Sequence, residues 1–240
     1  MKKVTDSISV FFPTYNEEEN IKNTVILAKK VLEEISNNWE IIIVNDGSTD
    51  NTLAVSKKLS EEDKRIRIIS HSENRGYGAS LKSGFYNAKY PWICFTDVDG
   101  QFDFSEISNF LSKQKEENAD LVIGYYLGRK ASLFTILTSK VWEIIVSILF
   151  SMKVKDTDCG FKLVSKKVID TIDKLESERG AFISSELLIK AKKKGFKIVQ
   201  VGVNHYPRKK GKGTGRNIKV IIKSFIDLIR LWIKLNFSQK

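Results

Sequence analysis

Short apolar segments alternate with amphipathic helical segments along the first half of the chain. Apolar runs predict strands, and apolar residues spaced three and four apart predict helices. Strands that alternate with helices join through right-handed crossovers, so this order predicts an α/β fold with a mostly parallel central sheet. The strands are apolar throughout, which is typical of a sheet with helices on both faces. We expect strands at residues 8–12, 40–44, 66–69, 92–96 and 121–124, and helices at 17–36, 52–59, 78–88 and 105–115.

The second half of the sequence is less regular. It predicts an apolar segment at 133–150, a helix at 184–194, a strand at 197–203, a basic glycine-rich loop at 205–217 and a last helix at 218–237. In that last helix the charges recur every three or four residues, which leaves a broad apolar face. We therefore expect one domain over residues 1–216 and an amphipathic C-terminal helix over 217–240.

Charge and cysteine content limit the partners and the compartment. The chain has 240 residues and a formal net charge of +11, which favours anionic partners such as phosphorylated substrates, a membrane surface or nucleic acid. General solubility is the alternative explanation for this charge. The two cysteines, Cys94 and Cys159, lie far apart, and a reducing cytosol fits them. We expect no signal peptide and no spanning helix.

Polar clusters follow three of the expected strands, at residues 14–17, 45–48 and 97–99. Ligands of parallel sheets gather beyond the carboxyl ends of the strands, so these clusters predict one shared site. Residues i and i+2 of a strand point the same way, which places the carboxylates of Asp97 and Asp99 on one face. Two such carboxylates can hold a divalent cation whose other ligands are phosphate oxygens. A solvated turn is the alternative for an isolated Asp-x-Asp.

Two further segments suit a nucleotide. Asp46, in the turn-forming run Asn45-Asp46-Gly47-Ser48, could accept hydrogen bonds from a base or ribose, although Asx turns explain the same residues. Arg75 lies in a glycine-containing run at residues 74–79 that precedes a helix, where backbone can approach a phosphate.

These segments, taken in order, resemble family 2 glycosyltransferases. The resemblance rests on Pro13-Thr14-Tyr15-Asn16-Glu17, Val44-Asn45-Asp46-Gly47-Ser48, Asn74-Arg75-Gly76 and Asp97-Val98-Asp99-Gly100-Gln101. Asp158-Cys159-Gly160-Phe161-Lys162 and His205-Tyr206-Pro207-Arg208 resemble the polyprenyl-phosphate (dolichyl-phosphate) mannosyl- and glucosyltransferase branch. The resemblance implies a GT-A nucleotide-diphospho-sugar transferase fold.

The resemblance also implies roles for individual residues. Those expected at the nucleotide are Pro13, Tyr15, Glu17, Asp46, Arg75 and Asp97. Those expected at a Mg²⁺ or Mn²⁺ ion are Asp97, Asp99 and Gln101. Those expected at the reacting phosphates are Asp99, Arg129, Lys162 and Arg208. Asn45 departs from the pattern, because many relatives have a second acid there.

The reaction implied is a metal-dependent, inverting transfer of a hexose from GDP-mannose or UDP-glucose to a polyprenyl monophosphate. Such a phosphate is already mostly dianionic at neutral pH and needs no general base. The alternative is a family 2 enzyme with a glycan or protein hydroxyl acceptor, for which Asp158 or Glu186 could be the base. A non-catalytic nucleotide- or RNA-binding module is the third alternative, but the carboxylates would repel a nucleic-acid backbone and no nucleic-acid partner is expected.

The lipid acceptor implies a place for the enzyme. We expect peripheral contact with the cytoplasmic face of the membrane, through segment 133–150 and the last helix. For the apolar face of the last helix, core packing and a homo-oligomer contact are equally open.

Overall fold

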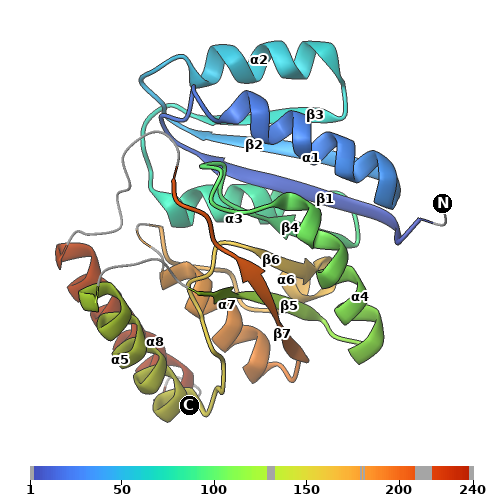
Figure 1. The fold of residues 1–240 in the computed structure, drawn as a ribbon. Helices are drawn as coiled ribbons and strands as arrows, with labels where there is room; N and C mark the ends of the chain where they lie inside the picture. Colours follow the sequence, from blue (N-terminus) through green and yellow to red (C-terminus); the bar gives the residue numbers. More distant parts are fainter. Residues whose placement is uncertain (1–2, 129–132, 179, 181, 209–217, 238–240) are drawn as a thin grey trace.

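The computed structural model describes residues 3–128, 133–178, 180, 182–208 and 218–237 (Figure 1). Its strands are β1 (Thr5–Thr14), β2 (Ser36–Asp46), β3 (Ile66–His71), β4 (Trp92–Phe95), β5 (Leu121–Leu127), β6 (Lys162–Ser165) and β7 (Ile198–Asn204). Its helices are α1 (Ile21–Ile35), α2 (Thr52–Glu62), α3 (Tyr77–Asn87), the 3₁₀ turn η1 (Phe104–Glu106), α4 (Ile107–Glu117), α5 (Leu133–Phe150), α6 (Lys166–Thr171), α7 (Phe182–Lys193) and α8 (Ile218–Phe237).

The strands form one seven-stranded sheet in the order β3-β2-β1-β4-β6-β5-β7. Strands β3, β2, β1 and β4 are parallel, and β5 pairs parallel with β7. Strand β6 runs antiparallel between β4 and β5. The mostly parallel sheet predicted from the sequence is therefore confirmed, with one antiparallel strand that the sequence analysis did not anticipate.

Helices cover both faces of the sheet, as predicted. Side chains of β1 alternate between two cores, with Phe11 in one and Val10 and Phe12 in the other. The core on the Phe11 side includes α3, α6, α7 and the inner sides of α5 and α8. The other core includes α1, α2 and α4. Helix α3 can lie close to the sheet because Gly84 has no side chain. A Cβ at this position would approach the Phe11 ring to 2.2 Å.

Several predicted boundaries differ from the structure. The helix expected at 17–36 begins at Ile21, because residues 17–20 form a turn in which the Asn20 amide donates to the Glu17 carbonyl. The following strand is longer than expected and begins at Ser36, where pairing with Thr5 of β1 already starts. The boundary expected at 216/217 lies outside the described residues.

Helices α5 and α8 lie side by side at one end of the molecule (Figure 1). The rings of Trp142 on α5 and Phe225 on α8 meet at 5.0 Å between centroids. Both helices have a buried side, with Trp142 and Val146 on α5 and Leu228 and Leu231 on α8. None of the described helices is both long and apolar enough to cross a bilayer.

Candidate active site

Strands β2, β1 and β4 are neighbours, so their carboxyl ends lie at the same edge of the sheet. The three polar clusters predicted from the sequence follow these ends and meet there. Hydrogen bonds join the first two clusters: the Asn16 amide donates to Ser48 Oγ over 3.0 Å, and the Thr49 amide donates to Asn16 Oδ1 over 2.8 Å. Pro13 is buried, and Tyr15 is 39% exposed beside it.

The pair Asp97 and Asp99 follows β4 and is held by contacts from α1, from α3 and from its own loop. The Tyr77 hydroxyl donates to Asp97 Oδ1 over 3.1 Å, and the Gln101 amide donates to Asp99 Oδ1 over 3.0 Å. The Thr24 hydroxyl of α1 donates to the carbonyl of the intervening Val98 over 2.9 Å. This backbone bond holds the strand end that carries both carboxylates.

Burial and the proximity of the two carboxylates change their acidity. Burial, and then the neighbouring charge of Asp99, raise the pKa of Asp97 to about 7. Burial also raises the pKa of Asp99, against the opposing effects of the Gln101 amide and Arg208. Two partly desolvated carboxylates side by side favour an added cation, because a cation compensates the charge that burial penalises.

Gly160 lies against this pair from the other side. A Cβ at this position would approach Asp97 Oδ2 to 2.3 Å, so any larger residue would displace the carboxylate. Gly160 precedes β6, and the antiparallel course of β6 beside β4 brings it to the strand end.

Arg208 reaches the carboxylates from the segment after β7. Its guanidinium donates to Glu17 Oε1, and its Nη2 lies 3.6 Å from Asp99 Oδ2. Burial raises the pKa of Glu17, while the Asn20 amide and Arg208 oppose that rise. The structure therefore brings together three of the predicted residues, Glu17, Asp99 and Arg208, from opposite ends of the chain.

Gln101 turns toward the same segment. Its side-chain amide lies 3.1 Å from His205 Nε2 and donates to the Tyr206 carbonyl over 3.2 Å. The Tyr206 amide donates back to the Gln101 carbonyl over 2.9 Å. Gln101 thus joins the strand-end loop of β4 to the residues that carry Arg208.

Asp46 is saturated by protein donors. Its carboxylate accepts from the amides of Arg75 (2.9 Å) and Gly76 (2.7 Å) and lies 2.6 Å from His71 Nδ1. The Arg75 guanidinium is half-exposed and pairs with Glu178 at 3.4 Å. Asp46 therefore holds the loop at residues 75–76 in place. Its partner His71 could not be predicted, because a single histidine 25 residues away shows no pattern in the sequence.

Lys162, which the resemblance places at the reacting phosphates, lies in the interior of the protein. Lys162 is fully buried at the start of β6, donates to the Cys159 carbonyl and has a pKa lowered by burial. Its ammonium lies under the site and 5.5 Å from the centroid of the Phe95 ring. Arg129 and the basic residues 209–217 lie outside the described residues.

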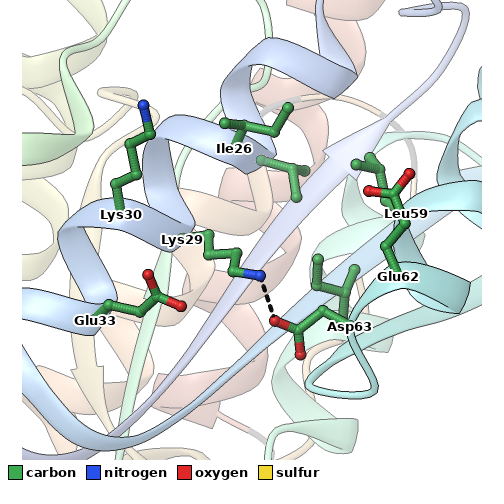
Figure 2. Close-up of a pocket in the computed structure, with 9 residues that line it drawn as sticks. Ile26, Lys29, Lys30, Glu33, Leu59, Glu62 and Asp63 are labelled. Carbon is green, nitrogen blue, oxygen red and sulfur yellow. Dashed lines mark ion pairs between the residues drawn. The ribbon is translucent and has the colours of Figure 1, made fainter.

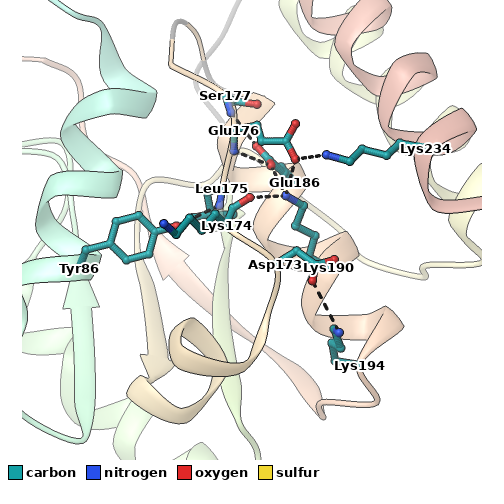
Figure 3. A network of polar contacts seen from close by, with 10 residues as sticks. All are labelled: Tyr86, Asp173, Lys174, Leu175, Glu176, Ser177, Glu186, Lys190, Lys194 and Lys234. Atoms are coloured by element: carbon teal, nitrogen blue, oxygen red, sulfur yellow. Dashed lines mark hydrogen bonds and ion pairs between the residues drawn. The ribbon is translucent and has the colours of Figure 1, made fainter. Parts of the chain in front are cut away.

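The carboxylate Glu186, considered as a base for a hydroxyl acceptor, lies in a buried network (Figure 3). It accepts from the amides of Glu176 (2.8 Å) and Ser177 (3.0 Å) and from Lys190 Nζ at 2.7 Å. Both side chains of the Glu186–Lys190 pair are nearly inaccessible, at 2% and 3% exposed. Both oxygens of this carboxylate accept hydrogen bonds within the protein, which favours a structural role over that of a base.

Cys94 and Cys159 are both buried free thiols. Burial raises the pKa of Cys159 to about 12 and that of Cys94 well above its ordinary range. Neither thiol is therefore ionised at neutral pH, and neither is arranged as a nucleophile.

Two pockets lie outside the strand-end site. One, of about 260 Å³, lies between α1 and α2 at the amino end of β3, where Lys29 Nζ pairs with Asp63 Oδ2 at 2.7 Å (Figure 2). The carboxyl ends of the parallel strands are at the opposite edge, so this pocket is separate from the site. The other, of about 500 Å³, is lined by α7, α8 and residues 176–178, and it adjoins Arg75 through Glu178.

The donor set at the strand end fits a divalent cation shared with a diphosphate. Within residues that the structure describes, no group of three or more His, Cys, Asp and Glu side chains forms a complete metal cage. Mg²⁺ is commonly held by one or two carboxylates together with substrate phosphates, and Asp97 with Asp99 matches that pattern.

The sheet order, with an antiparallel strand between two parallel groups, and the strand-end carboxylates define a GT-A glycosyltransferase fold. The solved structures agree. Glucosyl-3-phosphoglycerate synthase from Mycobacterium tuberculosis, in complex with Mn²⁺, uridine diphosphate and glucosyl-3-phosphoglycerate, has a TM-score of 0.71 and 18% identity. The match covers 95% of this chain and 79% of that one, which supports the fold alone.

The sequence places the chain more narrowly. The family model of glycosyl transferase family 2 matches residues 9–173, and the chain belongs to this family. It is 30% identical to dolichyl-phosphate beta-glucosyltransferase of Saccharomyces cerevisiae, over 82% of this chain and 66% of the relative. It is 27% identical to dodecaprenyl-phosphate galacturonate synthase of Rhizobium johnstonii, over 97% of this chain and 68% of the relative. The chain spans about two thirds of the length of these two relatives.

Proposed function

We propose that this protein transfers a hexose from a nucleotide sugar, GDP-mannose or UDP-glucose, to a polyprenyl (dolichyl) monophosphate with inversion at the anomeric carbon. The observation that carries the proposal is the pair Asp97 and Asp99 facing Arg208 at the carboxyl ends of the strands. The names of the two relatives support a polyprenyl-phosphate acceptor, and their different sugars leave both donors open.

In this proposal the donor lies over the ends of β1, β2 and β4. Pro13, Tyr15 and Glu17 lie on one side of the nucleotide, and the loop that Asp46 holds, with Arg75, lies on the other. Mg²⁺ or Mn²⁺ held by Asp97 and Asp99, beside Gln101, would supply compensation for charge on the departing nucleoside diphosphate.

In this proposal the protein's own residues act mainly by compensating charge. Arg208, and Arg129 from its predicted place in the acceptor loop, would balance phosphate charge, because the acceptor and the diphosphate are both anionic. Lys162 is buried, so we propose that it acts through the field it adds beneath Asp97 rather than by direct phosphate contact. An acceptor that is already dianionic needs no base, which agrees with the saturated Glu186.

The lipid acceptor places the protein at a membrane surface in this proposal. Exposed apolar side chains recur on the outer side of each helix, Leu137, Val141, Ile144 and Ile148 on α5 and Ile226, Ile229, Ile233 and Phe237 on α8. This spacing of three and four residues makes one apolar stripe per helix, as in helices that lie in a membrane interface. We propose peripheral contact at the cytoplasmic face through these stripes.

A transfer assay tests the reaction. Purified protein is incubated with labelled UDP-glucose or GDP-mannose, Mg²⁺ or Mn²⁺, and polyprenyl phosphate. We expect label to enter the organic phase with one donor and to stay in water when the lipid lacks its phosphate. Transfer to a glycan or protein hydroxyl in place of the lipid would favour the alternative family 2 activity, and RNA binding without any transfer would favour a binding module.

Asp99→Ala should abolish the transfer while the protein stays folded. The carboxylate lies at a strand end rather than within a helix or strand, and burial penalises its charge, so we expect a near-native melting temperature. Asp103→Ala is the matched control, because Asp103 lies in the same loop, is exposed and only caps η1 through the Ser105 amide at 2.9 Å. Full activity of Asp99→Ala in the metal-supplemented assay would contradict the role proposed for this carboxylate.

A further inference from the structure

Three side chains from three elements form a hydrogen-bonded chain next to residues 75–76, the loop that we expect to approach the nucleotide sugar. Asp46 ends β2 and His71 ends β3, and the two residues are paired in register. Imidazole Nδ1 lies 2.6 Å from Asp46 Oδ1, and Nε2 lies 2.9 Å from the Ser83 hydroxyl of α3. The side chains of Asp46 and His71 are 4% and 6% exposed.

The Asp46 carboxylate, which His71 orients, also holds the loop at residues 75–76. Its Oδ1 also accepts from the Arg75 amide at 2.9 Å, and its Oδ2 accepts from the Gly76 amide at 2.7 Å. Gly76 has a φ of 100°, a conformation that a side chain would strain, and α3 begins at the next residue. The orientation of one carboxylate thus sets the backbone path into α3.

The loop is also packed against the end of β2. A Cβ on Gly47 would approach the carbonyl carbon of Glu73 to 2.3 Å, so the segment before Arg75 lies directly on the turn after Asp46. On the other side of the loop, the next residue, Tyr77, donates to Asp97. An error in the loop position would therefore move both Arg75 and the hydroxyl that holds Asp97.

We infer that His71 is a positioning residue for donor binding: it orients Asp46 so that the Arg75–Gly76 loop is preformed for the nucleotide sugar. The inference rests on the proposed function and extends it. The order Ser83, His71, Asp46 also resembles a nucleophile triad, but the imidazole is enclosed and Asp46 has committed its other oxygen to Gly76. The unit therefore holds a loop and is not arranged for covalent chemistry.

The geometry predicts which replacement of His71 retains its function. A carboxylate between two amides needs a third donor from the His71 side to stay in its observed orientation. An asparagine at 71 can place its amide nitrogen near the position of Nδ1 and keep the bond to Asp46. A glutamine reaches toward Ser83 instead and leaves Asp46 without that donor.

The test compares His71→Asn with His71→Gln, which have equal charge and similar polarity. Isothermal titration with UDP and with GDP, in Mg²⁺, gives the nucleotide Kd, and transfer kinetics give KM for donor and for polyprenyl phosphate. We expect His71→Asn to lie within about threefold of wild type and His71→Gln to raise nucleotide Kd and donor KM together by about tenfold. The acceptor KM should change less than about twofold in both variants.

Ser70→Ala is the matched control, because it removes the 2.9 Å bond from Asn45 to the same strand but no bond to Asp46. We expect it to bind nucleotide like wild type. Equal nucleotide Kd values for His71→Asn and His71→Gln would overturn the inference, and so would parallel rises in donor and acceptor KM. Wild-type protein that binds neither nucleotide would overturn the proposed function itself.

Discussion

Three carboxylates surround one guanidinium at the strand-end site. Glu17 and Asp99 contact Arg208 directly, and Arg208 also lowers the pKa of Asp97 against the effect of burial. The guanidinium therefore stands where a divalent cation would compensate the same charges. Binding of a cation at Asp99 requires that this ion pair be weakened.

Arg208→Gln should consequently bind Mn²⁺ more tightly in the absence of nucleotide while it loses transfer activity. We expect a several-fold decrease in the Mn²⁺ Kd, on the order of 1 kcal/mol, because the uncharged glutamine does not compete with the cation for Asp99 as the guanidinium does. Electron paramagnetic resonance of free Mn²⁺ measures this. Arg75→Gln, whose guanidinium pairs with Glu178, should leave the Mn²⁺ Kd unchanged. An equal or weaker affinity in Arg208→Gln would show that no competition occurs.

The position of two of these carboxylates could be predicted from the sequence for a physical reason. Asp97 and Asp99 were identified because they follow an apolar strand and carboxyl ends of parallel strands share an edge. Tyr77 and Gly160 were missed as supports of Asp97, because their contacts join segments far apart in the sequence. The burial of Lys162 was missed for the same reason, since only the pairing of β6 with β4 and β5 places it inside the sheet.

At the scale of elements, the long apolar strands and periodic helices could be predicted, and the short β6 could not. Strand β6 begins with Lys162 and ends with Ser165, so it lacks the apolar run that predicted the equally short β4, and antiparallel pairing to two distant strands gives no local signal. Asp63 also makes a contact that the sequence does not predict, because it follows the last residue of α2 and pairs with Lys29 of α1 (Figure 2). It pairs as well with Arg65, two residues further along the chain.

Asp63→Asn should destabilise the protein at neutral pH and not at strongly acidic pH. Hydrogen bonds from Arg65 hold the pKa of Asp63 well below its usual value of about 3.9. A depressed folded-state pKa contributes stability above the unfolded-state pKa, and that contribution is lost as the pH falls toward the folded-state pKa. We expect a loss of roughly 1 kcal/mol at pH 7 in urea unfolding. A loss that stayed constant down to pH 2 would assign it to packing instead.

For the whole molecule, charge and apolar surface act together. In the membrane contact that we propose, the net charge of +11 would attract the chain to an anionic bilayer, and the stripes on α5 and α8 would offer apolar side chains for insertion. Both helices pack their buried sides against the core on the Phe11 side of the sheet, where Trp142 contacts Phe225. This packing connects the two stripes with the part of the protein that supports the site.

Ile229→Glu should weaken binding to vesicles that contain acidic phospholipid by about tenfold, because an exposed apolar side chain is replaced by a charge. Vesicle sedimentation measures the binding. Leu27→Glu on α1 is the matched control, since Leu27 is 50% exposed and Ile229 is 53% exposed. Equal losses in the two variants would indicate general electrostatic repulsion from the bilayer, and no loss in Ile229→Glu would assign the α8 stripe to another contact.

The position of β6 has a consequence for biosynthesis. A nascent chain that has emerged only as far as β5 lacks the strand that separates β4 from β5, so the edge of β4 stays open until residues 162–165 leave the ribosome. Up to that moment only the part of the sheet made of β3, β2, β1 and β4 can form, because both neighbours of β5, β6 and β7, come later in the chain. A chain that ends before residue 165 would therefore expose the unpaired edge of β4. Chaperone binding during translation should be strongest between the emergence of β4 and that of β6.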